Sequence, residues 1–283
     1  MIDNINATMK VSVIVITRNA GIFMRDCLDS LVHQHRLPDE VLIVDANSTD
    51  DTQAIVKEYT AKWPFVKLLV HPGTRGEGRN HGVGKAAGDI VAFIDADAIA
   101  HALWVEELAK AMESADVVAG REVRLGYHGF TSLKRVGMLF NGVDITYPSV
   151  NLAYRKSAFD AIEGFDPWFK EAEEVDLNYR AVEAGYRLVY HPKAIVYHNA
   201  RSSFSGFFKQ SFWYGFGRKE LTLRHGNLWT SYSPLEMVKV SKEENIWKLL
   251  RLVFSFLGYM FCKVVGKKET AKERLRRSKA SER

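Results

Sequence analysis

Apolar runs of three to six residues alternate with stretches of helical periodicity along the first 120 residues. The runs are rich in Val and Ile and contain few polar residues, a pattern typical of strands buried on both faces. The predicted strands are residues 11–16, 41–44, 65–70, 90–94 and 117–119, and the predicted helices are residues 22–32, 51–62, 77–87 and 102–112. This alternation predicts an α/β fold with a mostly parallel central sheet and helices on both faces.

Polar clusters follow three of these strands, at residues 17–19, 45–50 and 95–97. Because the carboxyl ends of parallel strands meet at one edge of a sheet, the clusters should line a ligand cleft. Asp95 and Asp97 place two negative charges close together, which a divalent cation bound to phosphates would compensate. An Asp-x-Asp sequence alone is more often a solvated turn, so the prediction of a nucleotide cleft depends on all three clusters.

The composition is that of a globular protein, with 47% hydrophobic and 26% charged residues in a chain of 283. Cys27 and Cys262 lie far apart and lack metal-ligand spacing, so neither a disulfide framework nor a zinc site is expected. Residues 1–9 are polar and the first apolar run has the length of a strand, which argues against a signal peptide. We therefore expect an enzyme of the reducing cytoplasm.

Positive charge is concentrated at the C-terminus. The chain has 39 basic and 34 acidic side chains. Residues 263–283 contain nine of the basic and three of the acidic side chains, which leaves 30 basic and 31 acidic side chains in the rest of the chain. A nucleic-acid-binding domain would carry its basic residues on the folded surface. The distribution indicates a basic tail that meets an anionic surface, and no nucleic-acid partner is expected.

A glycine-rich stretch at residues 76–82 raises the possibility of a dinucleotide-binding fold. Its spacing is G-x-G-x-x-x-G, one residue longer than the dinucleotide motif, and it follows the third predicted strand instead of the first. The sequence contains no Walker motif either. NAD binding and P-loop chemistry are therefore both disfavoured.

A series of short motifs between about residues 10 and 225 carries a family resemblance. They are VSVIVITRN (11–19), VLIVDANSTD (41–50), RNHG (79–82), AAGDIVAFIDAD (86–97), NLAY (151–154), GFD (164–166), EEVDLNYR (173–180) and VYH (196–198). Each motif is weak alone, but the ordered set is similar to the family 2 glycosyltransferases, which are inverting enzymes of the GT-A fold.

The resemblance implies a nucleotide-sugar donor at the first two strand ends. Thr17, Asn19 and Asp45 would line the base and ribose. Arg79 would reach the nucleotide or its phosphates, whose oxygens suit the fixed geometry of a guanidinium. Relatives often have a second, base-contacting acid after the second strand; Ala46 stands at that position here, so the base is not defined.

The resemblance also implies a metal site. Asp95 would lie near the ribose and the metal, and Asp97 would bind the metal, with His198 as a further ligand. Mg²⁺ or Mn²⁺ suits such ligands together with a diphosphate, and a cation stabilises the charge that builds on the leaving diphosphate. A single histidine at a strand end is equally often structural.

Two acids precede a predicted helix that ends near Gly185. By resemblance, Glu174 is the general base that deprotonates the acceptor hydroxyl, with Glu173 as the other candidate. Asp176 is expected to stabilise the first turn of the helix instead. A capped surface helix without catalytic function is the alternative.

Acceptor recognition is expected after the donor-binding half. Asn151, Trp168 and Trp213 are the candidate contacts, although aromatic side chains in this part of the chain are equally typical of a core. Residues 204–224 are aromatic with interspersed basic side chains, and we interpret them as a flexible cover over the diphosphate.

Residues 246–265 are mostly apolar but free of charge only from 252 to 262, too short a stretch to span a bilayer. On a helix the polar and small side chains fall on one stripe, made of Lys248, Arg251, Ser255, Gly258, Cys262 and Lys263. Together with the basic tail, this predicts an amphipathic helix on an anionic membrane surface. A helix packed on the catalytic body or on a second subunit is the alternative.

The features together predict a metal-dependent inverting glycosyltransferase of the hexosyltransferase type, bound peripherally to the cytoplasmic face of the cell membrane. Its acceptor would be a glycan or a lipid-linked hydroxyl, in polysaccharide or glycolipid synthesis. Residues 1–120 would bind the donor, 121–225 would hold the acceptor and the base, and 226–283 would contact the membrane. A metal-dependent nucleotidyltransferase and a non-catalytic glycosyltransferase-like binding module are the alternatives.

Overall fold

The computed structural model describes residues 9–133, 135–199, 203–226 and 246–281, with side chains in the last range described as far as residue 265. The chain divides into two compact units. The first comprises residues up to Leu125, Gly137–Pro167 and Glu174–Asn199, and the second comprises Gly126–Val136, Trp168–Glu173 and the described residues after Ala200. The segment that leads into the predicted base therefore belongs to the second unit.

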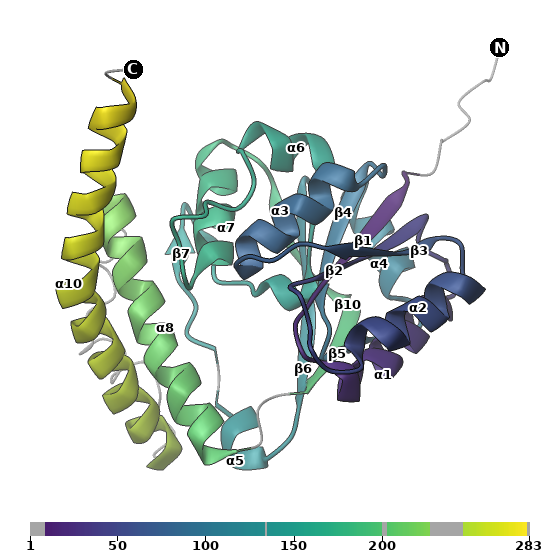
Figure 1. The fold of residues 1–283 in the computed structure, drawn as a ribbon, viewed down its shortest axis with the longest axis horizontal. Helices are drawn as coiled ribbons and strands as arrows, with labels where there is room; N and C mark the ends of the chain where they lie inside the picture. Colours follow the sequence, from purple (N-terminus) through teal and green to yellow (C-terminus); the bar gives the residue numbers. More distant parts are fainter. Residues whose placement is uncertain (1–8, 134, 200–202, 227–245, 282–283) are drawn as a thin grey trace. The chain divides into compact units, whose positions relative to one another are not determined.

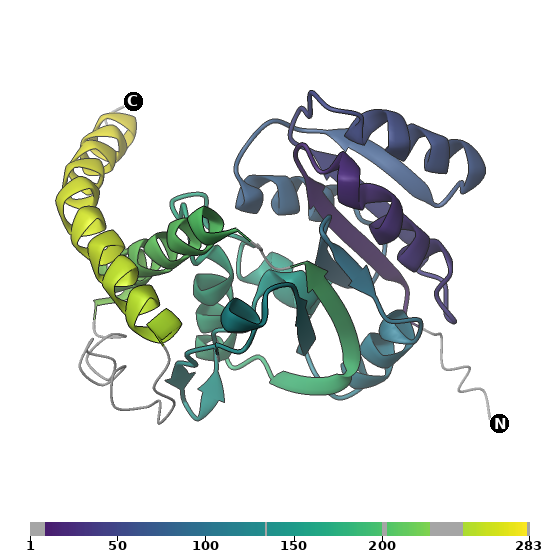
Figure 2. The ribbon, with the colours of Figure 1, turned by 90° about the horizontal axis from the view of Figure 1, so that it is seen from below.

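The first unit is built on a mixed sheet of eight strands (Figures 1 and 2). The strand order is β3 (Val66–Val70), β2 (Glu40–Asp45), β1 (Val11–Thr17), β4 (Ile90–Asp95), β9 (Leu152–Arg155), β6 (Val117–Leu125), β10 (Leu188–Asn199) and β5 (Ala98–Ala100). Parallel pairs join β3 to β2, β2 to β1, β1 to β4, and β6 to β10. Because β9 and β5 run antiparallel to their neighbours, the sheet is mixed but mostly parallel, as predicted.

Helices cover both faces of this sheet, which confirms the predicted α/β architecture (Figure 1). On one face, α1 (Gly21–Val32), α2 (Thr52–Lys62) and α4 (Trp104–Met112) share a hydrophobic core with alternate residues of the central strands. On the other face lie α3 (Arg75–Lys85), α6 (Lys156–Ala161) and α7 (Glu173–Glu183), which pack on Ile14, Phe93 and Tyr154. The apolar residues of β1 and β4 are buried on both faces, which explains their nearly continuous hydrophobic sequences.

Two of the sequence motifs meet on α3. A Cβ on Gly82 would lie 2.7 Å from Cγ2 of Ile14, so the glycine lets α3 approach β1 closely. Asn80 exchanges two hydrogen bonds with the backbone of Phe165, through Nδ2 at 2.7 Å and Oδ1 at 2.9 Å. The turn before Phe165 requires a positive φ of 62° at Gly164. The motifs at 79–82 and 164–166 are therefore one structural unit.

The polar edge of the sheet departs from the sequence prediction. Strand β5 was not predicted, because three residues beside two aspartates carry too little periodicity to indicate a strand. Strand β6 has nine residues where 117–119 was predicted, and β10 has twelve where the sequence indicates only a short apolar run at 194–197. The register between them shifts from His191 to Ile195, around Pro192, which has no N–H to donate to the ladder.

Short elements occupy the stretch in which little regular pattern was recognised. The strands β7 (Leu139–Phe140) and β8 (Val143–Asp144) form a hairpin. Its turn, Asn141-Gly142, has positive φ at both residues, as a two-residue hairpin turn requires. A 3₁₀ turn, η1 (Ser149–Asn151), then leads into β9.

The second unit is helical, with α5 (His128–Thr131), α8 (Phe204–His225) and α10 (Ile246–Ser281). In both views α8 and α10 lie side by side (Figures 1 and 2). Their backbones approach closely: a Cβ on Gly215 would lie 1.7 Å from the Ser255 carbonyl oxygen, and one on Gly258 would lie 1.8 Å from that of Phe212. The prediction of a flexible cover at residues 204–224 is therefore wrong, because this segment is a helix packed on α10.

The small residues of the predicted polar stripe of α10 pack against α8. Gly258 and Cys262 are buried, and Ser255 donates a 2.8 Å hydrogen bond to the carbonyl oxygen of Ser211 in α8. Ser255 and Gly258 therefore lie in the interhelical contact, to which Phe254 and Phe261 add ring contacts with Phe208 and Phe212 of α8. Large apolar side chains of α10 are nevertheless exposed. Those at least 40% exposed are Ile246, Leu249, Val253, Phe256, Leu257, Met260, Phe261 and Val264. Among the described residues, no helix combines the length and hydropathy needed to cross a bilayer.

Candidate functional site

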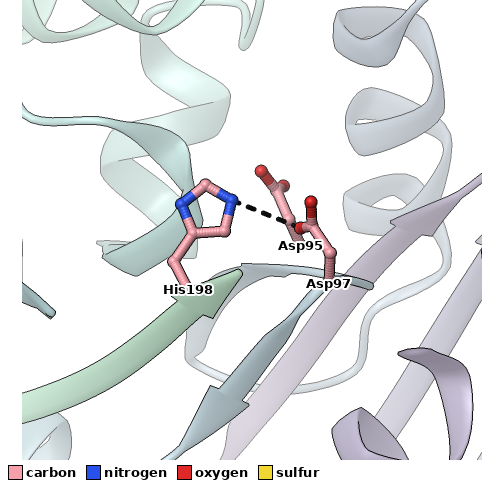
Figure 3. Close-up of side chains that lie close together, drawn as sticks. All are labelled: Asp95, Asp97 and His198. Carbon is pink, nitrogen blue, oxygen red and sulfur yellow. Dashed lines mark ion pairs between the residues drawn. The ribbon is translucent and has the colours of Figure 1, made fainter. Parts of the chain in front are cut away.

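Asp95, Asp97 and His198 converge at the polar edge of the sheet (Figure 3). Asp95 ends β4 and Asp97 directly precedes β5. Strand β5 pairs with β10 so that Ala98 lies opposite His198, which brings the imidazole to two aspartates that lie more than 100 residues earlier in the sequence. The Nε2 atom of His198 lies 3.3 Å from Oδ1 of Asp97.

This cluster has the donor set of a divalent-metal site. Each residue offers one ligand atom, and the three atoms lie within 4.8 Å of one another. The side chains are partly exposed, at 30% for Asp95, 38% for Asp97 and 21% for His198, so a phosphate-bearing ligand has access. Two carboxylates and one imidazole suit Mn²⁺, and the carboxylates suit Mg²⁺.

Glu122 on β6 orients the histidine and was not recognised in the sequence. Its Oε1 lies 2.8 Å from Nδ1 of His198, so Nε2 is directed toward Asp97. Burial lowers the pKa of His198, but hydrogen bonds with Asp97 and Glu122 outweigh it and raise the pKa to about 10. Burial raises the pKa of Glu122, but His198 and Arg124 lower it to about 2.

A signal for Glu122 was present in the sequence. The pattern Glu122-Val-Arg124 places two charged side chains on one face of a strand, but the predicted strand ended at residue 119. Pairing in register with β10 carries β6 on to Leu125 and so brings Glu122 beside the site. Charged neighbours of this kind commonly fix the orientation of metal-binding histidines.

Arg79 is buried and linked to the same cluster. Its Nη2 donates to Oδ1 of Asp95 at 2.9 Å, and its guanidinium packs 5.5 Å from the ring centroid of Phe165. The capping box between Thr74 and Glu77 fixes the start of α3 and hence the position of Arg79 one turn later.

The first two strand ends are tied into one loop structure. Asp45 is fully buried, and its carboxylate accepts hydrogen bonds from Ser48 and Gln53. Asn19 has a φ of 51°, and its Oδ1 accepts from the Thr49 backbone at 2.8 Å. In this structure Asp45 and Asn19 shape the polar edge.

Thr17 has a different environment. Its Oγ1 is buried and has no hydrogen-bond partner among the residues that the structure describes. A buried hydroxyl without a partner costs free energy unless a ligand supplies one. Thr17 therefore fits a role in ligand binding at the end of β1.

The candidate bases lie in the first turn of α7 and differ in exposure. Glu173 is 4% exposed, whereas Glu174 is half-buried. Asp176 is fully buried and pairs with Arg180 at 2.7 Å, and Arg180 also donates to the carbonyl oxygens of Ile162 and Gly164. Asp176 thus has a structural partner within the helix.

The three candidate acceptor residues occupy different surroundings. Asn151 is 1% exposed; its Oδ1 accepts from Trp104, and its Nδ2 donates to the carbonyl oxygens of Arg121 and Ala194. Asn151 therefore holds β6, β10 and α4 together in the core. Trp168 and Trp213 are partly buried in the second unit, Trp213 among the aromatic rings of α8.

Two family models match this sequence. One, described as glycosyl transferase family 2, matches residues 12–160, and another, described as glycosyl transferase family group 2, matches residues 90–264. The probable glycosyltransferase YdaM of Bacillus subtilis is 23% identical over 287 residues, covering 92% of this chain and 65% of that protein. The pre-mycofactocin glycosyltransferase of Mycobacterium tuberculosis is 28% identical over 233 residues, covering 76% of this chain and 48% of that protein. The chain thus spans between about half and two thirds of these relatives' length.

Solved structures share the fold. The mannosyltransferase PcManGT from Pyrobaculum calidifontis, in complex with GDP-Man and Mn²⁺, has a TM-score of 0.62 at 17% identity, covering 93% of this chain and 80% of that one. S. aureus TarS residues 1–349, in complex with UDP, has a TM-score of 0.57 at 24% identity, covering 83% of this chain and 77% of that one. Since the first family model matches more than half of the 283 residues, the chain belongs to glycosyl transferase family 2, and it has the GT-A fold.

Proposed function

We propose that this enzyme transfers a hexose, with inversion, from a nucleoside-diphosphate sugar to an acceptor hydroxyl, and that it requires a divalent metal. The observation that carries the proposal is the cluster of Asp95, Asp97 and His198 at the carboxyl end of the sheet. A metal bound there would stabilise the diphosphate as it leaves. The relatives solved with GDP-Man and Mn²⁺ or with UDP-GlcNAc support this class of donor.

On the donor side, residues 1–120 supply the proposed contacts. The hydroxyl of Thr17 would bind the nucleotide, because it is buried without a partner among the described residues. Asn19 and Asp45 would define the wall of the nucleotide site through the loop that they hold together. Asp95 would sit between the metal and Arg79, so that the arginine acts on the diphosphate site through the carboxylate.

Glu174 is the proposed general base. It would take the proton of the acceptor hydroxyl while the oxygen attacks the anomeric carbon and the bond to the diphosphate breaks on the opposite side. Its partial exposure gives an acceptor access, whereas Glu173 is almost completely buried. Trp168 and Trp213 would contact the acceptor from residues 121–225, and Asn151 is left out of this site because its amide is engaged in the core.

We further propose a peripheral position on the inner face of the cell membrane, with a glycan or lipid-linked acceptor. The exposed apolar side chains of α10 form a continuous outer face from Ile246 to Val264. The basic residues that follow, from Lys267 to Arg283, would add attraction to anionic lipid; their side chains lie outside the described part of the chain. Apolar burial and charge together give stable association where either alone is marginal.

The decisive experiment is release of free nucleoside diphosphate by the full chain from a panel of UDP- and GDP-sugars, with Mn²⁺, with Mg²⁺ and with EDTA. A glycosyltransferase should release nucleoside diphosphate from one donor in a metal-dependent manner. Release of pyrophosphate from a nucleoside triphosphate and a sugar phosphate would indicate a nucleotidyltransferase instead. Donor binding without turnover, with any acceptor supplied, would indicate a binding module.

A further inference from the structure

Glu220 in α8 is a buried acid whose carboxylate binds two consecutive backbone N–H groups. The N–H of Lys170 lies 3.2 Å from its Oε1, and the N–H of Glu171 lies 3.0 Å from its Oε2. The side chain is 4% exposed, and all three residues belong to the second unit. A carboxylate that accepts from two successive amides fixes both the position and the direction of that backbone.

The same backbone is confined from a second direction. One turn before Glu220, a Cβ on Gly217 would lie 2.9 Å from the Cβ of Ala172 and 3.0 Å from that of Glu171. The absence of a side chain at Gly217 therefore lets residues 171–172 lie directly against α8. Ala172 has a φ of 58°, in the left-handed region that non-glycine residues seldom adopt, and such a conformation persists only where the surroundings hold it.

This held segment ends at the candidate bases. Glu173 directly follows Ala172, and Glu174 is the next residue and stands in the first turn of α7. The two hydrogen bonds of Glu220 and the contact with Gly217 thus act on the three residues that precede the pair of acids. A displacement of about 1 Å in a reacting group lowers turnover by as much as about 10²-fold.

We infer that Glu220 is a positioning residue for the general base: it clamps the Lys170–Ala172 backbone onto α8 and so sets where α7 begins. The inference rests on the proposed function, because it needs one of the two acids to be the base. Burial raises the pKa of Glu220 to about 8, against the opposing effect of the two backbone N–H groups. Near pH 7 the side chain is therefore mostly the neutral acid, whose two oxygens can still accept from the two N–H groups.

The test uses Glu220→Gln in the full chain. The amide is the same size but offers one acceptor oxygen, and its NH₂ group faces the second backbone N–H. We expect turnover to fall about 10-fold or more, while the Kd for the metal–nucleotide complex changes less than about twofold. Amide hydrogen exchange across residues 168–175 should become at least several-fold faster, with exchange in β1 and β4 unchanged.

Ser211→Ala is the matched control in α8. Ser211 is also buried, but its hydroxyl donates to the carbonyl oxygen of Phe207 within the helix, and it touches none of residues 168–173 in the described contacts. Its turnover should stay within about twofold of wild type. Gly217→Ala perturbs the same backbone by contact instead of by hydrogen bonding, and should also lower turnover with donor Kd unchanged.

Unchanged turnover in a folded Glu220→Gln protein would overturn the inference, and so would an equal loss in Ser211→Ala. If Glu220→Gln does not fold, Gly217→Ala decides, and if neither folds the pair is structural and the inference is wrong. If the wild-type chain releases no nucleoside diphosphate from any donor, the proposed function has failed. In that case, faster amide hydrogen exchange at residues 168–175 in Glu220→Gln would still show that Glu220 holds the Lys170–Ala172 backbone.

Discussion

Arg79 and Asp95 form an ion pair in which the arginine is buried and the aspartate faces the proposed metal site. The guanidinium lies 2.9 Å from the carboxylate, and 2% of the arginine side chain is exposed compared with 30% of the aspartate. A buried cation beside a metal ligand orients that ligand. Direct contact of Arg79 with the nucleotide stays a prediction, and under the proposed function its link to Asp95 would let it act on the donor through the metal.

The first prediction concerns this pair. Arg79→Lys keeps the charge but loses the planar donor group that spans from Asp95 to Phe165, so Asp95 loses its fixed orientation. We expect the affinity for Mn²⁺ with nucleoside diphosphate to fall about 10- to 100-fold, measured by isothermal titration calorimetry. Lys85→Gln, an exposed change on the same helix, should leave it unaltered. Equal affinities in wild type and Arg79→Lys would contradict the coupling.

The second prediction concerns the metal. Asp97→Asn removes the most exposed carboxylate of the cluster and should lower kcat/KM about 10²-fold or more, because the leaving diphosphate loses its cation. The fold should persist, since Asp97 is not in the core. Asp26→Asn, an exposed change on α1, is the control. Full activity of the wild-type enzyme in excess EDTA would show that no metal is needed.

The third prediction separates the two candidate bases. Glu174→Gln should lower kcat by roughly 10²–10⁴-fold with little change in donor Kd, the range expected for a positioned general base. Glu173→Gln alters a residue that is almost completely buried, so a thermal unfolding curve must accompany its kinetics. If Glu173→Gln remains folded and loses turnover while Glu174→Gln does not, the two roles are exchanged.

The fourth prediction concerns the pH dependence of stability. Glu40 is 5% exposed and accepts hydrogen bonds from Ser12 at 2.7 Å, Lys67 at 2.8 Å and the Ala87 backbone at 2.6 Å. Burial opposes ionisation, but these partners outweigh it and lower the pKa of Glu40 below its usual 4.5. Its stabilisation is therefore present above pH 4.5 and is lost as the pH falls through the lowered value.

Glu40→Gln should accordingly reduce the free energy of unfolding by about 1–3 kcal/mol at pH 7. The lost ion pair with Lys67 should account for only a small part of this reduction, because that lysine is half exposed. The difference from wild type should shrink below pH 4.5. Urea unfolding of both proteins at pH 7 and at pH 3.5 measures this difference in the free energy of unfolding. A difference that is constant with pH would mean that the charge of Glu40 contributes nothing.

The fifth prediction concerns the outer face of α10. Leu249→Glu combined with Phe256→Glu places two charges on this face, where both side chains are about half exposed, so the contact with α8 should survive. Sedimentation with vesicles containing phosphatidylglycerol should be lost, while helix content is kept. Ile22→Glu, at an 84% exposed position on α1, should sediment like wild type. Unaltered sedimentation of the double variant would exclude α10 as the lipid contact.

The sequence by itself determined the architecture of the first half and indicated the residues of the candidate metal site. Strands β1, β2 and β4 are apolar on both faces, so their burial in a parallel sheet follows from composition and spacing alone. Asp95 and Asp97 belong to one such strand end, and their proximity follows from chain geometry. The order of the motifs then indicated the family, and His198 followed as a metal-site candidate from that resemblance.

Only the tertiary structure decided the contacts that join distant segments. Strand β5 has three residues, and pairing with β10 alone makes it a strand and places His198 beside Asp97. The sequence also left open which side of α10 packs on protein. A helical wheel separates a polar stripe from an apolar face but does not say which of the two packs on protein. Gly215 and Gly258 permit the close approach of α8 and α10. This places Ser255 and Gly258 in the contact and leaves large apolar side chains such as Leu249 and Phe256 exposed.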